Sequence, residues 1–378
     1  MNSSHSIPIQ ATSKPLEGIL VIDFSQFLSG PSASLRLADL GARVIKVERP
    51  ETGDICRTLY ISNLELDGDS SIFHAINRNK ESFTADLKNH EDFVRVTRLI
   101  QEADVMIQNF RPGVMERIGL DYQSVKNFNP GIIYGEITGF GKEGPWKEAP
   151  GQDLLVQSRS GLTWLSGEPE PAPMGLALVD MGAGAHLTQG ILAALVRKSI
   201  TGQGAKVEVS LLESILDLQA DKLTSFLNKG KSEGHKKYSF EPDGIYQTAD
   251  SYITLGGGSL TLLAEVINAP ELITFQGKKH ELRKIIETKL KNHSTKEWIQ
   301  ILEANNFWCS EVLHWKQFFA HEGFKGLEMV QEVCRKNGHS LSTTRCPIRI
   351  DGQIYKSAKG SPKVGEDTLN ILKELLGS

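Results

Sequence analysis

The chain has 378 residues and lacks several features that would assign it to a specialised class of protein. Its four cysteines lie far apart, with no CxxC pair and no histidine cluster at zinc spacing, which argues for reduced thiols and against a bound metal. No apolar run approaches the ~20 residues that a bilayer span requires. The net charge of −4 gives no overall attraction to nucleic acid or to a membrane surface. We therefore expect a cytoplasmic protein that binds neither nucleic acid nor membrane.

Three common site motifs are also missing. The turn "SQFLSGPSA" after the first predicted strand is not GxGxxG, and the chain contains neither GxxxxGK[ST] nor GxSxG. These absences argue against a dinucleotide fingerprint, a P-loop and a serine-nucleophile elbow. The first residues, "MNSSHSIPIQATSKP", are polar and lack the basic and apolar regions of a signal peptide, so they are predicted to form a flexible arm.

The sequence does show alternating strand and helix patterns. An apolar strand at 19–23 is followed by a Ser-Gly-Pro turn, a helix from about 32 to 40 and a second strand at 44–47. Further apolar strands, "SFTADL", "DVMIQNF" and "GIIYGEITGF", are separated by helical segments such as "HEDFVRVTRLIQEA". This alternation predicts a large, doubly wound, Rossmann-like α/β domain with a parallel sheet.

After about residue 205 the pattern changes, and "KGKSEGHKK" has the composition of a linker. A hairpin pattern and three helical patterns then predict a smaller α+β lobe. The predicted organisation is a flexible N-terminal arm (1–15), a large α/β domain (16–205), a linker helix and loop (206–240), a small α+β domain (241–322) and a C-terminal return to the large domain (323–378).

Asp180 stands out in "GLALVDMGAGAHLTQGIL", because it is the only acidic residue between Glu170 and Glu208. It has two candidate roles: the N-cap of the helix that follows, which aspartate favours, or a reacting carboxylate. Its unperturbed pKa of ~3.9 would keep it ionised at neutral pH. His186 lies ~240° away around a continuous helix and is expected not to pair with it.

Several linked stretches resemble one family. They are "LSGPSASLRLADLGARVIKVERPETGDICR", "NRNKESFTADLK", "ADVMIQNFRPGVMERIGLDYQSVKNFNPGIIYGEITGFGKEGP", "LVDMGAGAHLTQGILAALVRKSITGQGAKVEVSLLES" and the closing "SPKVGEDTLNIL". The chain resembles the family III CoA-transferases (CaiB/BaiF family, formyl-CoA transferase-like), which share their fold with α-methylacyl-CoA racemases. The match runs almost continuously from residue 16 to about 220.

The resemblance implies an acyl-CoA:carboxylate CoA-transferase, with CoA esters and small carboxylic acids as substrates, no metal, and an interlocked homodimer. It gives Asp180 the role of a nucleophile that forms a mixed anhydride and then an aspartyl-CoA thioester. Gly182, Ala183 and Gly184 would leave room for a thioester, and the helix would aim free N–H groups at the carboxylate.

The same resemblance implies residues that bind CoA, although any one arginine could equally be a solvated surface charge. The candidate CoA-binding residues are Arg49, Asn109, Phe110, Arg117, Lys80, Arg111 and Met115. Those of the substrate pocket are Gln152, Gln26 and Leu28. An apolar Leu28 would argue against a small dicarboxylate such as oxalate.

Gln152 decides between functions on this fold. Racemases of the fold carry a histidine there as one of two acid/base groups, and an amide cannot exchange a proton near neutral pH. Gln152 could instead bind a substrate carbonyl or be a polar loop residue, and Asp153 could support the site or cap a helix. The alternatives to a transferase are therefore an acyl-CoA racemase or isomerase, and a CoA-binding paralogue without turnover.

Two further stretches have an ordinary structural interpretation. "LGGGS" could form a glycine flap, but a strand-to-helix turn with Ser259 as N-cap is favoured. In "NNFWCSEVL", Phe307 and Trp308 could shape an acyl pocket, but both are expected to fill core.

Overall fold

The computed structural model describes residues 14–166, 169–229 and 242–377. Contacts divide them into two compact units, one of 14–163, 172–229 and 329–377, the other of 164–166, 169–171 and 242–328. Most of the predicted N-terminal arm and the stretch "KGKSEGHKK" lie outside the described residues. In the part of the chain that is described, no helix combines the length and the apolar character needed to cross a membrane.

The first unit is built on a six-stranded sheet in which every neighbouring pair of strands is parallel. In spatial order the strands are β5 (Glu81–Thr84), β2 (Arg43–Glu48), β1 (Leu20–Asp23), β6 (Val105–Gln108), β7 (Ile133–Thr138) and β8 (Ala205–Ser210). This is the Rossmann strand order. From β1 the chain adds strands toward β5 on one side and from β6 toward β8 on the other, so the order of addition reverses between β1 and β6. The predicted parallel α/β sheet is confirmed, although β8 runs past the boundary expected at residue 205.

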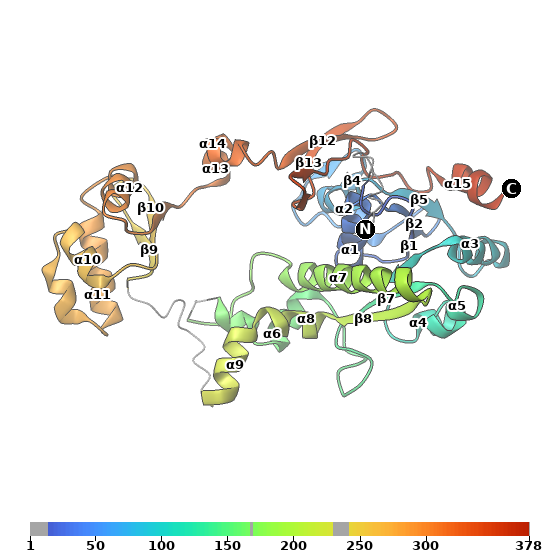
Figure 1. Ribbon diagram of the computed structural model, residues 1–378, viewed down its shortest axis with the longest axis horizontal. Helices are drawn as coiled ribbons and strands as arrows, with labels where there is room; N and C mark the ends of the chain where they lie inside the picture. Colours follow the sequence, from blue (N-terminus) through green and yellow to red (C-terminus); the bar gives the residue numbers. More distant parts are fainter. Residues whose placement is uncertain (1–13, 167–168, 230–241, 378) are drawn as a thin grey trace, which may run out of the picture. The chain divides into compact units, whose positions relative to one another are not determined.

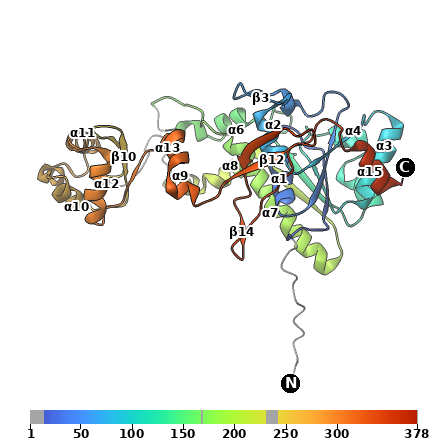
Figure 2. The ribbon, with the colours of Figure 1, turned by 90° about the horizontal axis from the view of Figure 1, so that it is seen from above.

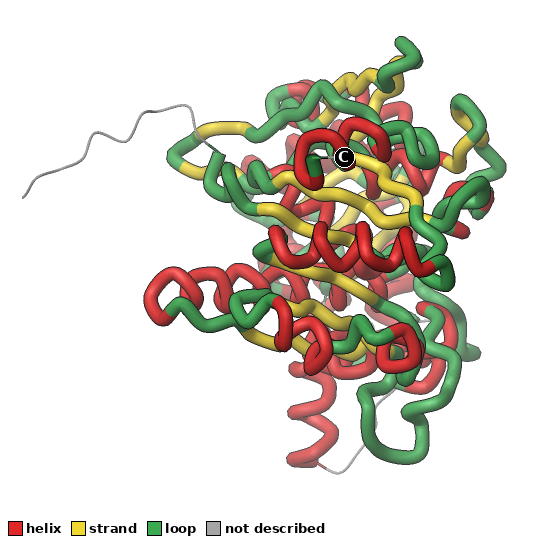
Figure 3. Tube along the Cα trace, turned by 90° about the vertical axis from the view of Figure 1, so that its right-hand side faces the viewer, coloured by secondary structure: helices red, strands yellow, loops and turns green. Residues whose placement is uncertain are grey.

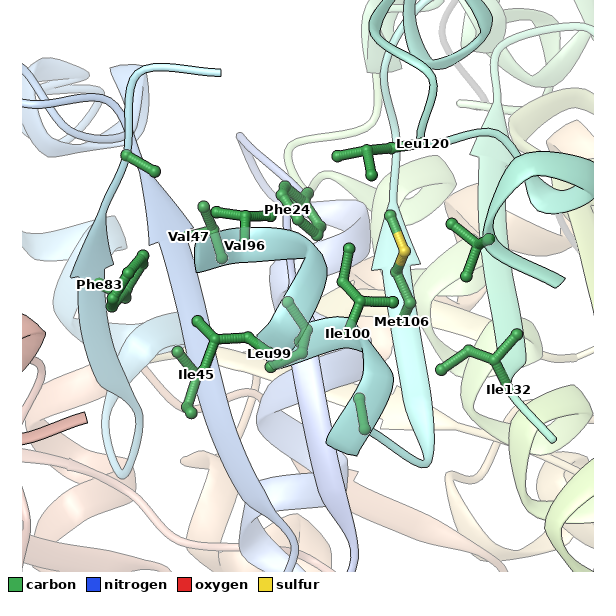
Figure 4. Packing of buried hydrophobic residues seen from close by; sticks show 14 of the residues in the cluster. Phe24, Ile45, Val47, Phe83, Val96, Leu99, Ile100, Met106, Leu120 and Ile132 are labelled. Carbon is green, nitrogen blue, oxygen red and sulfur yellow. The ribbon is translucent and has the colours of Figure 1, made fainter. Parts of the chain in front are cut away.

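Helices cover both faces of this sheet (Figures 1 and 3). The helices of the first unit are α1 (Ser29–Asp39), α2 (Ser71–Asn77), α3 (His90–Glu102), α4 (Val114–Ile118), α5 (Tyr122–Phe128), α6 (Asp153–Arg159), α7 (Leu178–Thr201), α8 (Leu211–Leu218), α9 (Ala220–Lys229) and α15 (Thr368–Leu376). Leu99 and Ile100 of α3 pack on Ile45 and Met106 of the sheet (Figure 4). On the other face, a Cβ added at Gly135 in β7 would lie 3.1 Å from Ile191 and 3.2 Å from Leu187 of α7.

Helix α1 begins one turn earlier than the sequence pattern predicts, at Ser29 instead of about residue 32. Pro31 lies in its first turn, where the missing proline N–H has no intrahelical partner to lose. Leu28 is the N-cap residue and its side chain makes no capping hydrogen bond. As a consequence Ser29, which the pattern assigns to a turn, becomes the first residue of a helix that packs against α7 (Figure 1).

The last segment of the chain completes the first unit. It contains β12 (Val330–Cys334), β13 (Ser340–Thr344), β14 (Arg349–Ile350), β15 (Gln353–Ile354) and α15. Buried Arg335 pairs with Asp67 and Asp69, beside the short strands β3 (Glu65–Leu66) and β4 (Asp69–Ser70) (Figure 2). At the open edge of the sheet, the N–H of Ser82 donates to the Asp367 carboxylate at 2.9 Å and that of Thr84 to the Thr368 hydroxyl at 3.0 Å.

The second unit has its own hydrophobic core and a small antiparallel sheet. Its elements are β9 (Gly244–Gln247), β10 (Tyr252–Leu255), α10 (Leu260–Val266), α11 (Lys279–Leu290), α12 (Thr295–Ala304), β11 (Cys309–Glu311), α13 (Trp315–Ala320) and α14 (Glu322–Lys325). Ser259 caps α10 through the N–H of Thr261, as predicted. Phe307 fills the core as expected, whereas Trp308 is 72% exposed and the expectation for it is wrong.

Candidate active site

The carboxyl ends of β2, β1 and β6 bring several of the predicted binding residues to one edge of the sheet. Arg49 directly follows β2, the turn at 24–28 follows β1, and Asn109 follows β6. The N–H of Gln26 donates to Asn109 Oδ1 at 2.8 Å, and Asn109 Nδ2 donates to the Gln26 carbonyl at 2.7 Å. This pair of hydrogen bonds spans the point where the strand order reverses, which is where open α/β sheets bind ligands.

Asp180 lies in the first turn of α7 but is not its N-cap, which is Ala177. The cap comes from another helix, α6. Asp153 Oδ2 accepts hydrogen bonds from the N–H groups of Val179 and Asp180, both at 3.0 Å, and Gln157 Nε2 holds Asp153 Oδ1 at 2.5 Å. The expectation that free N–H groups of α7 would face the Asp180 carboxylate is therefore wrong, because Asp153 accepts from two of them.

The position of Asp153 depends on a close backbone approach ahead of α6. The Cβ that an alanine would place at Gly151 would lie 2.4 Å from the Cα of Gly139, and the converse distance is 2.6 Å. Only glycine allows this crossing. Gln152 is the N-cap residue of α6, with an exposed side chain that makes no capping hydrogen bond. Its amide is therefore accessible, while the neighbouring Asp153 is buried against α7.

The electrostatics of Asp180 differ from those of a free aspartate. Burial and, to a lesser extent, the nearby Asp153 carboxylate raise the pKa of Asp180 to about 7, against an opposing effect of the Ser29 hydroxyl. The expectation of a fully ionised carboxylate at neutral pH is therefore wrong. Ser29 was not among the predicted site residues, because the sequence pattern gave it no helical position facing α7.

The small residues after Asp180 have a packing role. A Cβ on Gly184 would lie 2.7 Å from the carbonyl oxygen of Ser29 and 2.1 Å from Ser32 Oγ, so Gly184 allows α1 and α7 to approach. A Cβ on Gly182 would meet Leu218 of α8 at 3.0 Å. These glycines thus make room for neighbouring helices, where the sequence suggested room for a substrate.

The predicted CoA-binding residues fall into three groups by their burial. Arg49, Arg111 and Arg117 are exposed, whereas Asn109 and Phe110 are partly buried at the same sheet edge. Met115 is 2% exposed within the core cluster under α3. Lys80 is fully buried, with its ammonium bonded to Asp23 at 3.2 Å and to Asn77 Oδ1 at 2.8 Å.

Two other sequence-level candidates have partners of their own. Leu28 is partly buried and packs against the cluster of Cys56, Phe73 and Ile76, so its side chain is engaged in core packing. His186 contacts Asp217 of α8 at 3.3 Å, and not Asp180. Within the described segments, no three His, Cys, Asp or Glu side chains gather in a way that could hold a metal ion.

The fold and the site together define an α/β protein of Rossmann strand order that presents a partly buried carboxylate near its switch-point edge. The model of "CoA-transferase family III" matches residues 16–368. The succinate–glutarate CoA-transferase of Agrobacterium fabrum is 31% identical over 382 residues, covering 96% of both chains. The acetyl-CoA:oxalate CoA-transferase of Acetobacter aceti is 33% identical, covering 95% of both.

Solved structures agree with these relatives. A CAIB/BAIF family protein from Brucella suis superimposes with a TM-score of 0.86 at 31% identity, covering 96% of this chain and 100% of that one. The chain therefore belongs to the family III CoA-transferases, and it is an enzyme of that class. The resemblance found in the sequence motifs is confirmed.

Proposed function

We propose that this enzyme transfers CoA from an acyl-CoA donor to a small carboxylic acid, with Asp180 as the nucleophile. The observation that carries the proposal is the environment of Asp180. It is a partly buried carboxylate whose neighbours are Ser29 of α1 and Asp153 of α6. Relatives named for succinate and glutarate, and for acetyl-CoA and oxalate, support carboxylic acids as the substrate class.

The proposed reaction needs only carboxylates and a thiol. Asp180 attacks the acyl carbon of the donor thioester, and the C–S bond breaks. CoA thiolate is released, and a mixed anhydride of Asp180 and the donor acid remains. The thiolate then attacks the aspartyl carbonyl, which releases the donor acid and leaves an aspartyl-CoA thioester. The acceptor carboxylate attacks this thioester, which releases CoA thiolate and leaves a second mixed anhydride between Asp180 and the acceptor. The thiolate attacks the acceptor's carbonyl carbon in this anhydride, which forms the new acyl-CoA and frees Asp180. A carboxylate of raised pKa is more basic and therefore a better nucleophile than a solvated one.

The CoA moiety is proposed to lie along the sheet edge that Arg49, Asn109 and Phe110 border, with Arg111 and Arg117 as further candidates for its phosphates. Gln26 and Gln152 are proposed to border the acyl end. Lys80 and Met115 would support this edge from the interior. The homodimer and the cytoplasmic location expected from the sequence stay predictions.

Replacing Arg49 is expected to weaken CoA binding more than turnover. In Arg49→Ala the KM for acyl-CoA should rise by about tenfold, while kcat changes less, because a lost phosphate contact affects ground state and transition state alike. Steady-state kinetics at two salt concentrations would measure this effect. Arg98→Ala, which removes an exposed arginine on α3, is the matched control. An unchanged KM in Arg49→Ala would remove this residue from the CoA site.

A racemase would require a second proton-transfer group opposite Asp180. By its resemblance to racemases of this fold, Gln152 is proposed to occupy the position of such a group, and it is an exposed amide, while the adjacent Asp153 caps α7. Two-base epimerisation therefore lacks its partner.

The decisive experiment is the intact mass of the protein after brief incubation with a panel of acyl-CoAs. An adduct of CoA or acyl size, mapped to the peptide that holds Asp180, is expected with at least one donor. CoA binding without any adduct would contradict the covalent mechanism and favour a paralogue without turnover. Loss of an α-deuteron to solvent would instead identify an isomerase.

Asp153→Asn is expected to shift the pH dependence of the enzyme. Removing the charge of Asp153 lowers the pKa of Asp180, so the acidic limb of kcat/KM should move to lower pH by about half a unit to one unit. Asp153→Ala is the informative comparison, because it also removes the cap of α7 and should cost about 1–2 kcal/mol of stability. Profiles between pH 5 and 9, with urea denaturation, would measure both effects. If the acidic limb of kcat/KM in Asp153→Asn stays at its native pH, electrostatic coupling between Asp153 and Asp180 is excluded.

A further inference from the structure

Helix α6, which packs against α7, presents two buried polar side chains to the chain that enters α7 (Figure 1). Asp153 and Gln157 are four residues apart, so they lie on the same face of α6, and they are 9% and 2% exposed. Asp153 accepts hydrogen bonds from the first turn of α7. Gln157 binds the segment before that turn. The Met174 N–H donates to Gln157 Oε1 at 3.0 Å, and Gln157 Nε2 donates to the Leu176 carbonyl at 3.3 Å.

The orientation of the Gln157 amide follows from its three partners. Nε2 carries two N–H groups, one for the Leu176 carbonyl and one for Asp153 Oδ1, which lies 2.5 Å away, while Oε1 accepts from the Met174 N–H. The reversed amide would set N–H against N–H at Met174 and oxygen against oxygen at the other two partners. Both polar hydrogens of this amide are therefore used, and truncating the side chain would break all three hydrogen bonds.

The segment that Gln157 holds is exposed on its other side. Leu176 is 71% exposed, and a Cβ added at Gly175 would meet no atom within 4 Å. Side-chain packing therefore contributes little to the path of this segment, and its hydrogen bonds to α6 matter more. Gln157 holds the backbone four and six residues before Asp180, and Asp153 holds it at Asp180 itself.

We infer that Gln157 is a positioning residue for Asp180. It holds the backbone of residues 174–176, and it also holds the Asp153 carboxylate that caps α7. This inference rests on the proposed role of Asp180 as nucleophile. Attack on a thioester requires the reacting atoms to lie ~3–3.5 Å apart, and a displacement of ~1 Å can cost about 10²-fold in rate. Hydrogen bonds to α6 supply this precision to a residue in the first turn of a helix, where the backbone otherwise frays.

The first test uses the native protein. Hydrogen exchange, measured by mass spectrometry of short overlapping peptides, should show the amides of Met174, Val179 and Asp180 exchanging at least about 100-fold more slowly than in an unstructured peptide. Exchange of the Met174 amide at the unstructured rate would overturn the inference, because its bond to Gln157 would not persist in solution. This result does not depend on whether any variant folds.

The second test compares Gln157→Met with Gln101→Met. Methionine is about as long as glutamine but can make none of the three hydrogen bonds, and Gln101 is an exposed residue of α3 that serves as the matched control. In Gln157→Met, exchange at Met174, Val179 and Asp180 should accelerate by about tenfold or more, and kcat should fall by about 10- to 100-fold. The KM for acyl-CoA should change by less than about twofold, because the proposed phosphate contacts come from other elements.

The value of kcat is referred to the folded fraction of each variant, measured by circular dichroism. A glutamine that only stabilises the fold would lower that fraction and leave kcat per folded molecule unchanged. A native kcat in Gln157→Met, an equal loss in Gln101→Met, or a loss without faster exchange would overturn the inference. If Asp180→Asn still transfers CoA, the proposed nucleophile is wrong, whereas faster exchange at Met174 in Gln157→Met would still show that α6 holds this segment.

Discussion

Asp180→Asn is expected to lose CoA transfer by about 10³-fold or more, because an amide cannot form the anhydride or the aspartyl thioester. Acyl-CoA binding should remain, since the proposed phosphate contacts lie elsewhere. The covalent adduct seen with the native chain should be absent. Kinetics, equilibrium binding of CoA and intact mass would measure the three effects. Retention of more than a few per cent of the transfer activity would show that another group is the nucleophile.

The same variant is expected to be more stable than the native protein at alkaline pH. The pKa of Asp180 rises from 3.8 to about 7 on folding, so the folded state binds more protons than the unfolded state between these values. The stability of the native chain therefore falls as the pH rises through this window. The variant lacks that penalty, and its advantage should be about 1–2 kcal/mol at pH 8 and should vanish near pH 4. Urea denaturation at several pH values would measure it.

Gly184→Ala is expected to damage both stability and activity. The new Cβ would lie 2.7 Å from the Ser29 carbonyl, and a backbone atom cannot rotate away. The first turn of α1 must then separate from α7, at a cost of about 1–3 kcal/mol. This movement would also disturb the start of α7, which holds Asp180, so kcat should fall together with stability.

Gly182→Ala is the matched control on the same helix. Its Cβ would meet the end of the Leu218 side chain at 3.0 Å, and a side-chain end can shift. The loss of stability should therefore be smaller than in Gly184→Ala, by thermal and urea denaturation. A native-like stability of Gly184→Ala would show that the contact between α1 and α7 is looser than the structure indicates.

Local pattern was sufficient for the sheet and for the residues at its edge. Apolar strands alternating with helices predicted the parallel sheet, and residues directly after strands, such as Arg49 and Asn109, follow its carboxyl edge as expected. Both features depend on short-range regularities of the chain. They therefore appear in the sequence without knowledge of any distant contact.

The environment of Asp180 could not be predicted in this way. Its pKa depends on burial between helices and on Asp153, which lies 27 residues earlier in the chain. Lys80 is a candidate for CoA binding only through the family resemblance, and nothing in the sequence indicated that its ammonium bonds Asp23, 57 residues away. Ser29 was missed because the sequence pattern placed the start of α1 one turn too late.

The closing segment of the chain has a consequence for biosynthesis. The ribosome makes residues 329–377 after all the other parts of the first unit, yet they bring Arg335 to Asp67 and Asp69, and they cover the N–H groups of Ser82 and Thr84 at the sheet edge. Until this segment emerges, the nascent protein carries an open strand edge, a template for pairing with other chains. Translation that stops near residue 328 should therefore yield aggregates, and chaperones would have to shield this edge during synthesis.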